Sequence, residues 1–417
     1  MTDRSLAVHL YGQRIGTLVQ TTGGGHFFTY AEAYVEAGST PMSLAMPITA
    51  SPYGKKRIDP FLEGLLPDNS EVRERWGQKF GVNGRNAFAL LEHMGVDCAG
   101  AVEFHPDGEG VERQAVLERV SERDIAAHLM GLRSDETAWA VGGERWSLAG
   151  AQGKFALSRG VDGRWYEATG AAPSTHIVKP GVSGYRDQAL NEHVCLRTAR
   201  ILGMNAAATE FTTFEDQAAL VVTRYDRRRA ADGTITRVHQ EDMCQALSVY
   251  PWRKYEASGG PTAARIASLL WESGSEPSSD VPAFVRAVAF NYLMGAPDAH
   301  AKNYSLLLAG SQVSLAPLYD VASSLPYEPT TADHELDLAA MGIGGEKKFG
   351  QVTGAHWGKL ARQCRVSADR VRAIVQELAT DIPGALEQAF EEHRNAALRE
   401  RMLTRIGDHC AAALANL

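Results

Sequence analysis

Three polar side chains in the second half of the chain have the types and spacing of a phosphoryl-transfer site. Asp298 and Asn303 lie five positions apart in the stretch Gly295-Ala-Pro-Asp-Ala-His-Ala-Lys-Asn303. A protein-kinase catalytic loop has the same spacing, with the Asp as the base for the substrate hydroxyl and the Asn as a metal ligand. Residues 305–317 read as strand, glycine turn and strand, and lead to Asp320, a second candidate metal ligand. Phosphoryl transfer needs mainly positioning and charge neutralisation, which these groups can supply.

A loop of small residues, Ser147-Leu-Ala-Gly-Ala-Gln-Gly-Lys154, leads into a predicted strand. Small residues let backbone N–H groups approach phosphate oxygens closely. The loop is not a Walker A sequence, which requires glycine where Leu148 stands and serine or threonine where Phe155 stands. An ordinary turn is the alternative for this loop. A solvated polar loop is the alternative for the catalytic-loop candidate, because short motifs also match by chance.

Lys179 ends the predicted strand His176-Ile-Val-Lys179, and Glu192 lies on the following predicted helix. A kinase needs a strand lysine at the nucleotide phosphates and a helix glutamate that orients it, in this order. The alternative is a surface lysine and a solvated glutamate. Thr223-Arg224-Tyr225 lies where a strand-rich half meets a helix-rich half, and a hinge there would offer backbone groups to an adenine.

Three further polar features have weaker functional interpretations. Arg227-Arg-Arg229 reads as a solvated charge run more than as a nucleic-acid patch. Gln240-Glu-Asp-Met-Cys-Gln245 is either a substrate-binding segment or a capped helix that packs on the catalytic loop. His300 lies inside the catalytic loop, but without a HExxH motif or a cysteine partner the sequence gives a zinc role little support.

The composition limits the classes of protein to which the chain can belong. The chain has 417 residues, 44% of them hydrophobic and 22% charged, which predicts a globular protein of two or three subdomains. A net charge of −8 argues against broad nucleic-acid binding by the whole chain. Five scattered cysteines without a CxxC motif suggest reduced thiols in a cytosol. We expect neither a signal segment nor a membrane span, because no apolar run of about 18 residues occurs.

Hydrophobic periodicity predicts a strand-rich half up to about residue 225 and a helix-rich half after it. Strands are predicted over 6–11, 15–20, 26–30, 100–104, 155–158, 165–167, 174–180, 207–214 and 218–225. Helices are predicted over 71–80, 86–93, 121–132, 188–202, 241–249, 262–273, 280–295, 355–363, 367–379 and 384–415. A bilobed kinase requires this order, in which a sheet lobe covers the nucleotide and a helical lobe supplies the base and metal ligands.

Taken together, these motifs resemble the HipA family, bacterial serine/threonine-kinase toxins of type II toxin–antitoxin modules. The matching blocks run through nearly the whole chain and include Pro41–Pro47, Leu65–Asp68, Ser147–Lys154, Thr175–Lys179, Arg224–Arg227, Gln240–Gln245, Tyr255–Pro261, Asp298–Asn303 and Tyr319-Asp320. The resemblance implies an α+β, bilobed protein-kinase-like fold with a β-rich N-terminal lobe and an all-α C-terminal lobe. It implies a HipA N-terminal subdomain over 1–105, a linker and helix over 106–144, the nucleotide-binding part over 145–225 and the helical lobe over 226–417.

The resemblance also implies roles for matching positions. Asp298 would be the catalytic base, Asn303 and Asp320 the Mg²⁺ ligands, and Glu192 the partner in a supporting ion pair. Ser147 would be autophosphorylated, which ejects the phosphate loop and switches the enzyme off. The implied ATP-binding positions are Ala149, Gly150, Ala151, Gln152, Gly153, Lys154, Lys179, Thr223, Arg224, Tyr225, His300, Lys302, Asn303 and Asp320. Gly153 departs from the glutamate of the best-known member, and its flexibility predicts a different balance between loop positions.

By the same resemblance, the protein would be the cytoplasmic toxin of a HipBA-type module in a bacterium. It would phosphorylate an aminoacyl-tRNA synthetase, inhibit translation and cause growth arrest and persistence. Its partner would be a HipB-like helix-turn-helix antitoxin, which would supply most of the contact with operator DNA while the complex represses its own operon. Two alternatives stay open: a small-molecule phosphotransferase of the antibiotic-modifying type, and a protein that acts mainly as a transcriptional co-regulator.

Overall fold

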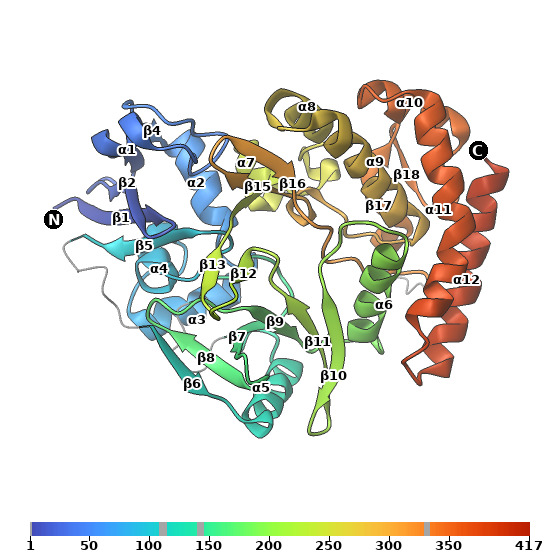
Figure 1. The fold of residues 1–417 in the computed structure, drawn as a ribbon, viewed down its shortest axis with the longest axis horizontal. Helices are drawn as coiled ribbons and strands as arrows, with labels where there is room; N and C mark the ends of the chain where they lie inside the picture. Colours follow the sequence, from blue (N-terminus) through green and yellow to red (C-terminus); the bar gives the residue numbers. More distant parts are fainter. Residues whose placement is uncertain (1, 108–114, 140–145, 329–333) are drawn as a thin grey trace. The chain divides into compact units, whose positions relative to one another are not determined.

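The computed structural model describes residues 2–107, 115–139, 146–328 and 334–417. The chain divides into two compact units, each built from several segments. The first unit comprises Met1–Val182, Thr212–Trp252 and Leu306–Gln312, and the second comprises Ser183–Phe211, Arg253–Ser305 and Val313–Leu417. Helices and sheets are both present, so the predicted mixed fold is confirmed (Figure 1).

An antiparallel sheet made from hairpins begins the first unit, as predicted. Its strands are β1 (Arg4–Leu10), β2 (Gln13–Gln20), β3 (His26–Tyr30), β4 (Tyr53–Gly54) and β5 (Val102–Pro106), in the order β4-β3-β2-β1-β5. The β1–β2 turn uses positive φ angles at Tyr11 and Gly12. Leu6, Val8 and Leu10 are buried on β1, where alternate positions share one face of the strand.

The helices of this unit are α1 (Glu32–Ala37), α2 (Lys55–Gly64), α3 (Ser70–Phe80), α4 (Ala87–Met94), α5 (Glu122–Ser134) and α7 (Met243–Ala246). Their ends follow local capping chemistry. Asn69 accepts backbone hydrogen bonds at the start of α3, Gly81 ends that helix with a φ of 67°, and Ser121 forms a capping box with Asp124. The sequence patterns did not predict α1 and α2, since α1 is short and Pro60 lies inside α2.

The residues that the sequence predicted to contact nucleotide phosphates lie on or beside a second sheet. Its strands are β6 (Val116–Arg119), β7 (Phe155–Arg159), β8 (Trp165–Thr169), β9 (His176–Lys179), β10 (Thr209–Phe214) and β11 (Gln217–Thr223), in the order β10-β11-β9-β7-β8-β6. Helix α5 packs against β11. Side chains of this sheet and of the N-terminal sheet belong to one apolar cluster, which includes Phe28, Phe88 and Val178.

Short strands occupy positions that were predicted to be helical or irregular. They are β12 (Arg227–Arg229), β13 (Ile235–Arg237) and β14 (His239–Asp242), and β14 pairs with β15 (Ser305–Ala309), the first strand of the predicted hairpin. The helix predicted over 241–249 is therefore only the four residues of α7, with Asp242 as its N-cap. β16 (Gln312–Leu315) follows β15 after a turn at Gly310, so the predicted hairpin is confirmed.

The second unit is mainly helical, and its long helices pack on one another. They are α6 (Gln188–Ile201), α8 (Ala263–Ser273), α9 (Pro277–Leu293), α10 (Gly354–Gln363), α11 (Ala368–Ala389) and α12 (Ala396–Ala415). Figure 1 shows α11 and α12 side by side at the red end of the chain, and α11 also packs on α6 and α9. Two 3-10 helices, η2 (Glu256–Ser258) and η3 (Ala301–Asn303), lie in its loops.

Three features of this unit differ from the prediction. The helix predicted over 384–415 is interrupted, because α11 ends at Ala389 and α12 begins at Ala396. Helix α11 continues through Pro383, where the sequence predicted a break, because Leu378, Ile382 and Leu386 keep the apolar face buried on both sides of the proline. Burial of several such side chains outweighs the cost of about 3 kcal/mol for an interior proline. The strands β17 (Leu338–Ile343) and β18 (Glu346–Lys348) form a small hairpin in a region expected to be helical or irregular.

Candidate active site

The catalytic-loop candidate is folded around the backbone carbonyl of Asp298. That carbonyl accepts hydrogen bonds from the His300 N–H at 2.8 Å and from the Asn303 amide nitrogen at 2.6 Å. The Asn303 N–H donates in turn to the His300 carbonyl at 2.9 Å, within η3. The amide nitrogen of Asn303 is thus committed to the loop, which leaves its amide oxygen as the atom suited to a cation.

The Asp298 carboxylate is the exposed group of this loop. Its side chain is 59% exposed, whereas the neighbouring His300 side chain is 3% exposed with Nε2 at 3.7 Å from Asp298 Oδ1. The Tyr255 hydroxyl donates to Asp298 Oδ1 at 2.5 Å. An accessible carboxylate of fixed orientation can accept a proton from an incoming hydroxyl.

Asp320 is held close to the same loop through its neighbour Tyr319. The Tyr319 hydroxyl donates to the Lys302 carbonyl at 2.6 Å and lies 2.6 Å from Ser305 Oγ. These anchors flank Asn303 in sequence, so the structure brings the segment of Asp320 against the segment of Asn303. Asp320 has a φ of 58°, a left-handed conformation that Asp and Asn tolerate better than most residues.

The donor set fits a hard divalent cation. Across the described residues, no group of three or more His, Cys, Asp and Glu side chains is arranged to hold a metal ion. Mg²⁺ does not require such a group, because proteins bind it through one or two carboxylates plus substrate phosphates and water. One carboxylate from Asp320 and one amide oxygen from Asn303 match that pattern.

In the first unit, the small-residue loop is anchored at its centre. The Asp68 N–H donates to the Gly150 carbonyl at 2.9 Å, and the Lys154 ammonium donates to the Ala149 carbonyl at 2.9 Å. Lys154 also lies 5.3 Å above the Trp139 ring. Gly150 has a φ of 104°, and a Cβ atom there would lie 2.6 Å from Lys154 Nζ, so this turn requires glycine.

Ser147, at the start of the loop, is fully buried. Its hydroxyl donates to the Leu65 carbonyl at 2.7 Å, and its N–H donates to the Asp97 carbonyl at 3.1 Å. Both partners belong to the N-terminal 105 residues. The position of the loop is therefore set by the N-terminal subdomain.

Strand β9 relates the loop to the hinge candidate. Phe155, which follows Lys154, pairs with Val178, which precedes Lys179, so the two lysines lie at the same end of paired strands. At the other end of β9, His176 pairs with Thr223. Three residue rises separate these ends, about 10 Å along a strand.

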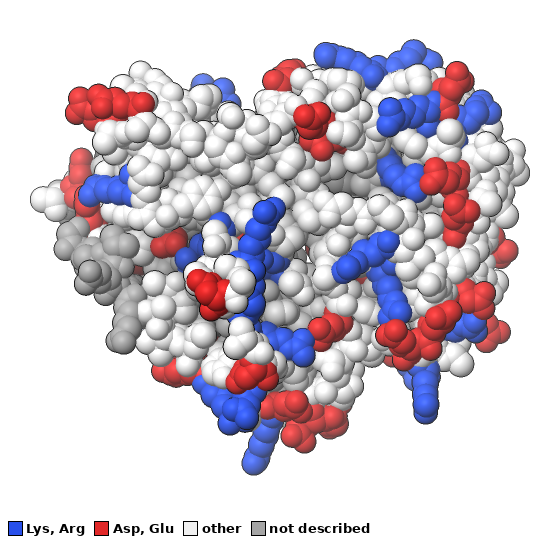
Figure 2. All heavy atoms as spheres, in the orientation of Figure 1, with Lys and Arg blue, Asp and Glu red and all other residues white. Residues whose placement is uncertain are grey.

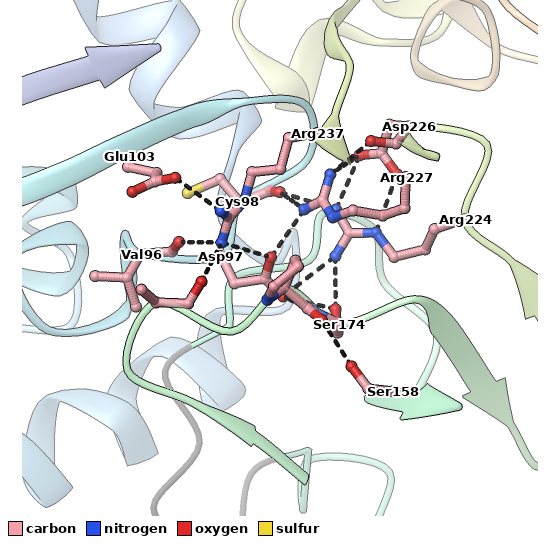
Figure 3. A network of polar contacts seen from close by, with 12 residues as sticks. Val96, Asp97, Cys98, Glu103, Ser158, Ser174, Arg224, Asp226, Arg227 and Arg237 are labelled. Carbon is pink, nitrogen blue, oxygen red and sulfur yellow. Dashed lines mark hydrogen bonds and ion pairs between the residues drawn. The ribbon is translucent and has the colours of Figure 1, made fainter. Parts of the chain in front are cut away.

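Arg224, the middle residue of the predicted hinge, is held by both its backbone and its side chain. Its N–H donates to the Thr175 carbonyl at 3.0 Å, and its side chain is buried. Figure 3 shows the guanidinium turned toward Asp226, Asp97 and Ser174, with Nε at 3.0 Å from an Asp226 oxygen and an Nη at 2.8 Å from Ser174 Oγ. The guanidinium of Arg224 therefore stabilises the fold, and the role of residues 223–225 as a nucleotide hinge stays a prediction.

Arg227 overturns the interpretation of residues 227–229 as a solvated run, because its side chain is buried while Arg228 and Arg229 are exposed. Its guanidinium contacts Asp97 at 2.8 Å and Asp226 at 3.0 Å. Arg237 joins the same network at Asp97, at 3.7 Å (Figure 3). Arg224 contacts the same two carboxylates and Glu103 contacts Arg237 at 2.9 Å, so three arginines and three carboxylates compensate one another.

The acids of this network stay ionised. Burial alone would raise the pKa of Asp97 and of Asp226, but the neighbouring arginines outweigh burial and hold both pKa values below the ordinary value. Arg227 and Arg224 act on both carboxylates, and Arg237 adds to the effect at Asp97. Removing one partner would leave an unpaired charge in the interior.

Two alternatives were given for the Gln240–Gln245 segment, and the structure shows a capped helix start there. Asp242 and Gln245 form its capping box. Its buried Glu241 accepts hydrogen bonds from the Ser43 hydroxyl at 2.5 Å and the Leu44 N–H at 2.8 Å. Burial raises the pKa of Glu241 to about 8. This segment thus ties β14 to the Pro41–Pro47 stretch within the first unit.

Glu192 lies on α6 in the second unit and is 1% exposed, which excludes the solvated alternative for this residue. Its neighbour Asn191 donates to the Ser323 carbonyl at 2.8 Å. Lys179 is also buried, in the first unit. No sequence pattern assigned a role to Asp97 or Tyr255, whose partners Arg227 and Asp298 lie 130 and 43 positions away in the chain.

Comparisons with known proteins agree with this arrangement. A model of the HipA N-terminal domain matches residues 6–105, and a model of the HipA-like C-terminal domain matches residues 146–386. The protein Y4mE of Sinorhizobium fredii is 33% identical over 417 residues, which covers 99% of this chain and 98% of that protein.

The chain belongs to the HipA family. A further member, the serine/threonine-protein kinase toxin HipA of Shewanella oneidensis, is 32% identical over 80% of this chain and 78% of its own length. A solved complex of HipA, HipB and operator DNA from the toxin–antitoxin system of S. oneidensis MR-1 contains a chain similar in structure, with a TM-score of 0.85 and 26% identity. That match covers 98% of this chain and 97% of the other. Membership therefore extends over both halves of the HipA fold.

Proposed function

We propose that this HipA-family chain is a Mg-ATP-dependent serine/threonine protein kinase. The observation that carries the proposal is the catalytic loop, in which Asn303 holds the Asp298 carbonyl and Tyr319 docks beside Asn303. Family membership supports the same activity, because the S. oneidensis relative is named a serine/threonine-protein kinase toxin.

In this proposal Asp298, Asn303 and Asp320 of the second unit each have one role. Asp298 accepts the proton of the substrate hydroxyl, and the Asn303 amide oxygen and the Asp320 carboxylate hold Mg²⁺. Bound Mg²⁺ supplies neutralisation of the charge on the nucleotide phosphates. Tyr319 and the η3 turn keep these groups in place before the substrate arrives.

The first unit supplies the nucleotide contacts. The loop from Ala149 to Lys154 and the Lys179 ammonium would face the phosphates, since both lie at one end of the β7–β9 pair. Thr223 and Tyr225 at the far end of β9 would offer backbone groups to the adenine. Arg224 fixes that hinge through its buried side chain, and Glu192 would support the phosphate-binding lysine.

The biological role follows the family. We infer that the protein is the toxin of a HipBA-type module, that its substrate is an aminoacyl-tRNA synthetase, and that phosphorylation of the synthetase blocks translation and arrests growth. Five buried, free cysteines suit a reducing cytoplasm. No helix in the described part of the chain is long and apolar enough to cross a bilayer.

A second role, co-repression with a HipB-like antitoxin, is supported by the likeness to a HipA chain solved with HipB and operator DNA. Figure 2 shows acidic and basic side chains mixed over the face in view, without a continuous basic surface among its described residues. With a net charge of −8, the chain suits operator binding mainly through its antitoxin. A gel shift of operator DNA by antitoxin, with and without this chain, tests this role; an unchanged affinity would count against it.

The kinase activity is tested by transfer of labelled phosphate from Mg-ATP in the purified protein. We expect label at Ser147 in the wild type and its loss in Asp298→Ala and Asp320→Ala. Equal labelling of wild type and Asp298→Ala would refute the assignment. Incubation with a bacterial lysate separates the two substrate classes, because a protein kinase labels a polypeptide and an antibiotic-type phosphotransferase labels a metabolite.

A further inference from the structure

The segment Lys254–Gly260 overlaps the block Tyr255–Pro261, which resembles the HipA family, and it contacts the catalytic loop directly. The Tyr255 hydroxyl donates to Asp298 Oδ1 at 2.5 Å. The Tyr255 ring meets the buried His300 ring edge-on, with centroids 4.9 Å apart. One residue earlier, the Lys254 carbonyl accepts a hydrogen bond from the Ala301 N–H at 3.2 Å. Backbone, ring and hydroxyl of this segment therefore all contact the loop that carries the base.

The same segment is held rigidly by its own turn. The Tyr255 carbonyl accepts hydrogen bonds from the N–H groups of Ser258 and Gly260, at 3.0 and 2.9 Å. A Cβ atom on Gly260 would lie 2.0 Å from the Arg253 carbonyl, so the close approach needs glycine. The Glu256 carboxylate accepts a hydrogen bond from the Gly342 N–H on β17, at 2.7 Å. Tyr255 is thus fixed on both sides while it reaches the base.

We propose that Tyr255 is a positioning residue for phosphoryl transfer, which holds the Asp298 carboxylate in its productive orientation. The inference rests on the proposed kinase function. A carboxylate accepts about four hydrogen bonds, so the bond from Tyr255 is compatible with one from the substrate hydroxyl.

In the transfer step, the substrate oxygen forms a bond with the terminal phosphorus of ATP. The bond from that phosphorus to the bridging oxygen breaks, and its electron pair leaves with ADP. The substrate proton moves to Asp298. Tyr255 keeps its own proton throughout, so its contribution is the direction in which the Asp298 oxygen faces.

The test compares Tyr255→Phe with Tyr250→Phe, which removes the same hydroxyl from a ring that stacks on Trp252 at 4.3 Å. Phenylalanine at 255 keeps the ring packed on His300. The rate of phosphate transfer is measured at one fixed pH and saturating Mg-ATP, together with the ATP concentration for half-maximal rate and the melting temperature. Asp298→Ala is measured in parallel.

We expect Tyr255→Phe to lower the maximal rate about ten- to a hundredfold, less than loss of the base itself. The half-saturating ATP concentration and melting temperature should stay close to those of Tyr250→Phe. A merely structural role would lower the melting temperature or raise the half-saturating ATP concentration together with the loss of rate.

Each other outcome has a separate meaning. If Asp298→Ala is inactive but the two tyrosine variants share one maximal rate, the inference on Tyr255 is wrong and the kinase assignment stands. If Tyr255→Phe is faster than wild type, Tyr255 blocks the base instead of positioning it, which also overturns the inference. A wild-type chain that transfers no phosphate, or transfers it as well as Asp298→Ala, overturns the proposed function and this inference with it.

Discussion

The Ser147 hydroxyl is buried and donates a hydrogen bond to the Leu65 carbonyl over 2.7 Å. Because this hydroxyl is shielded from solvent, the proposed autophosphorylation of Ser147 would require the loop to leave the interior first. A phosphoserine carries about −1.5 to −2 charges. That charge facing a carbonyl oxygen in a buried site would keep the loop from returning. Modification and loop release are therefore expected to be coupled.

Two substitutions of Ser147 distinguish the effect of losing a hydrogen bond from the effect of adding a negative charge. Ser147→Ala loses one hydrogen bond, about 1 kcal/mol of stability, and should bind Mg-ATP nearly as wild type does. Ser147→Asp buries a carboxylate against the Leu65 carbonyl, so the loop should be expelled and Mg-ATP binding should weaken at least tenfold, about 1.4 kcal/mol. Titration with a fluorescent ATP analogue measures both. Equal affinities in the two variants would contradict the coupling.

The metal-binding role of Asp320 is tested without disturbing its backbone. Its φ of 58° makes Asp320→Ala a strained change, whereas asparagine accepts the left-handed conformation. Asp320→Asn removes the charge and keeps the shape. We expect the Mg²⁺ concentration for half-maximal phosphate transfer to rise about tenfold or more, with little change in melting temperature. A Mg²⁺ dependence equal to that of the wild type would exclude Asp320 as a ligand.

The buried charge network predicts a large difference between adjacent arginines. Arg227→Met leaves Asp97 and Asp226 undercompensated in the interior, so we expect a loss of about 3–5 kcal/mol in the free energy of unfolding. Arg228→Met changes an exposed side chain and should stay within about 0.5 kcal/mol of wild type. Urea unfolding of both variants at pH 7 measures the difference. Similar values for the two would mean that the network contributes little.

Glu241 predicts a pH dependence of stability with a definite sign. Its pKa is raised to about 8 in the folded chain, above the ordinary value of 4.5. Between these values the folded state holds a proton that the unfolded state has lost, so stability is highest at low pH and falls as pH rises toward 8. Relative to Glu241→Gln, the wild type should lose about 1.4 kcal/mol per pH unit in this window.

Urea unfolding at half-unit steps from pH 5 to 9 measures this difference. Glutamine can keep hydrogen bonds with Ser43 and Leu44 and does not titrate, so other groups contribute equally to both curves. Parallel curves for wild type and Glu241→Gln would show that the carboxyl titrates normally in the fold.

Local patterns in the sequence predicted much of this structure. The hairpins of the N-terminal sheet were found because alternating apolar residues meet glycine turns, and α5 because Ser121 and Asp124 form a capping box. Asp298 and Asn303 were singled out because their five-residue spacing is itself the geometry of one short loop. Asp320 was predicted as a metal ligand because it follows two predicted strands that are joined by a turn at Gly310.

Features that depend on distant partners escaped prediction. Asp97 and Arg227 are 130 positions apart, and neither is distinguished locally from a solvated charge. Tyr255 reaches Asp298 across 43 positions. The strands β12 to β14 have three or four residues each, too short for a period of two to appear in the sequence. In each case tertiary packing, and not local propensity, decides the outcome.

The guanidinium of Arg224 donates to the Cys98 carbonyl at 2.8 Å, and that of Arg227 to the Gly100 carbonyl at 2.8 Å. A chain shortened to begin at residue 146 would keep both arginines and lose the acceptors and the Asp97 carboxylate that neutralise them. The rest of the chain therefore depends on the N-terminal subdomain for partners of these two arginines. A recombination event between family members that exchanged only the N-terminal subdomain would also need a matching segment around Arg224 and Arg227. The two parts of the chain are therefore expected to be inherited together.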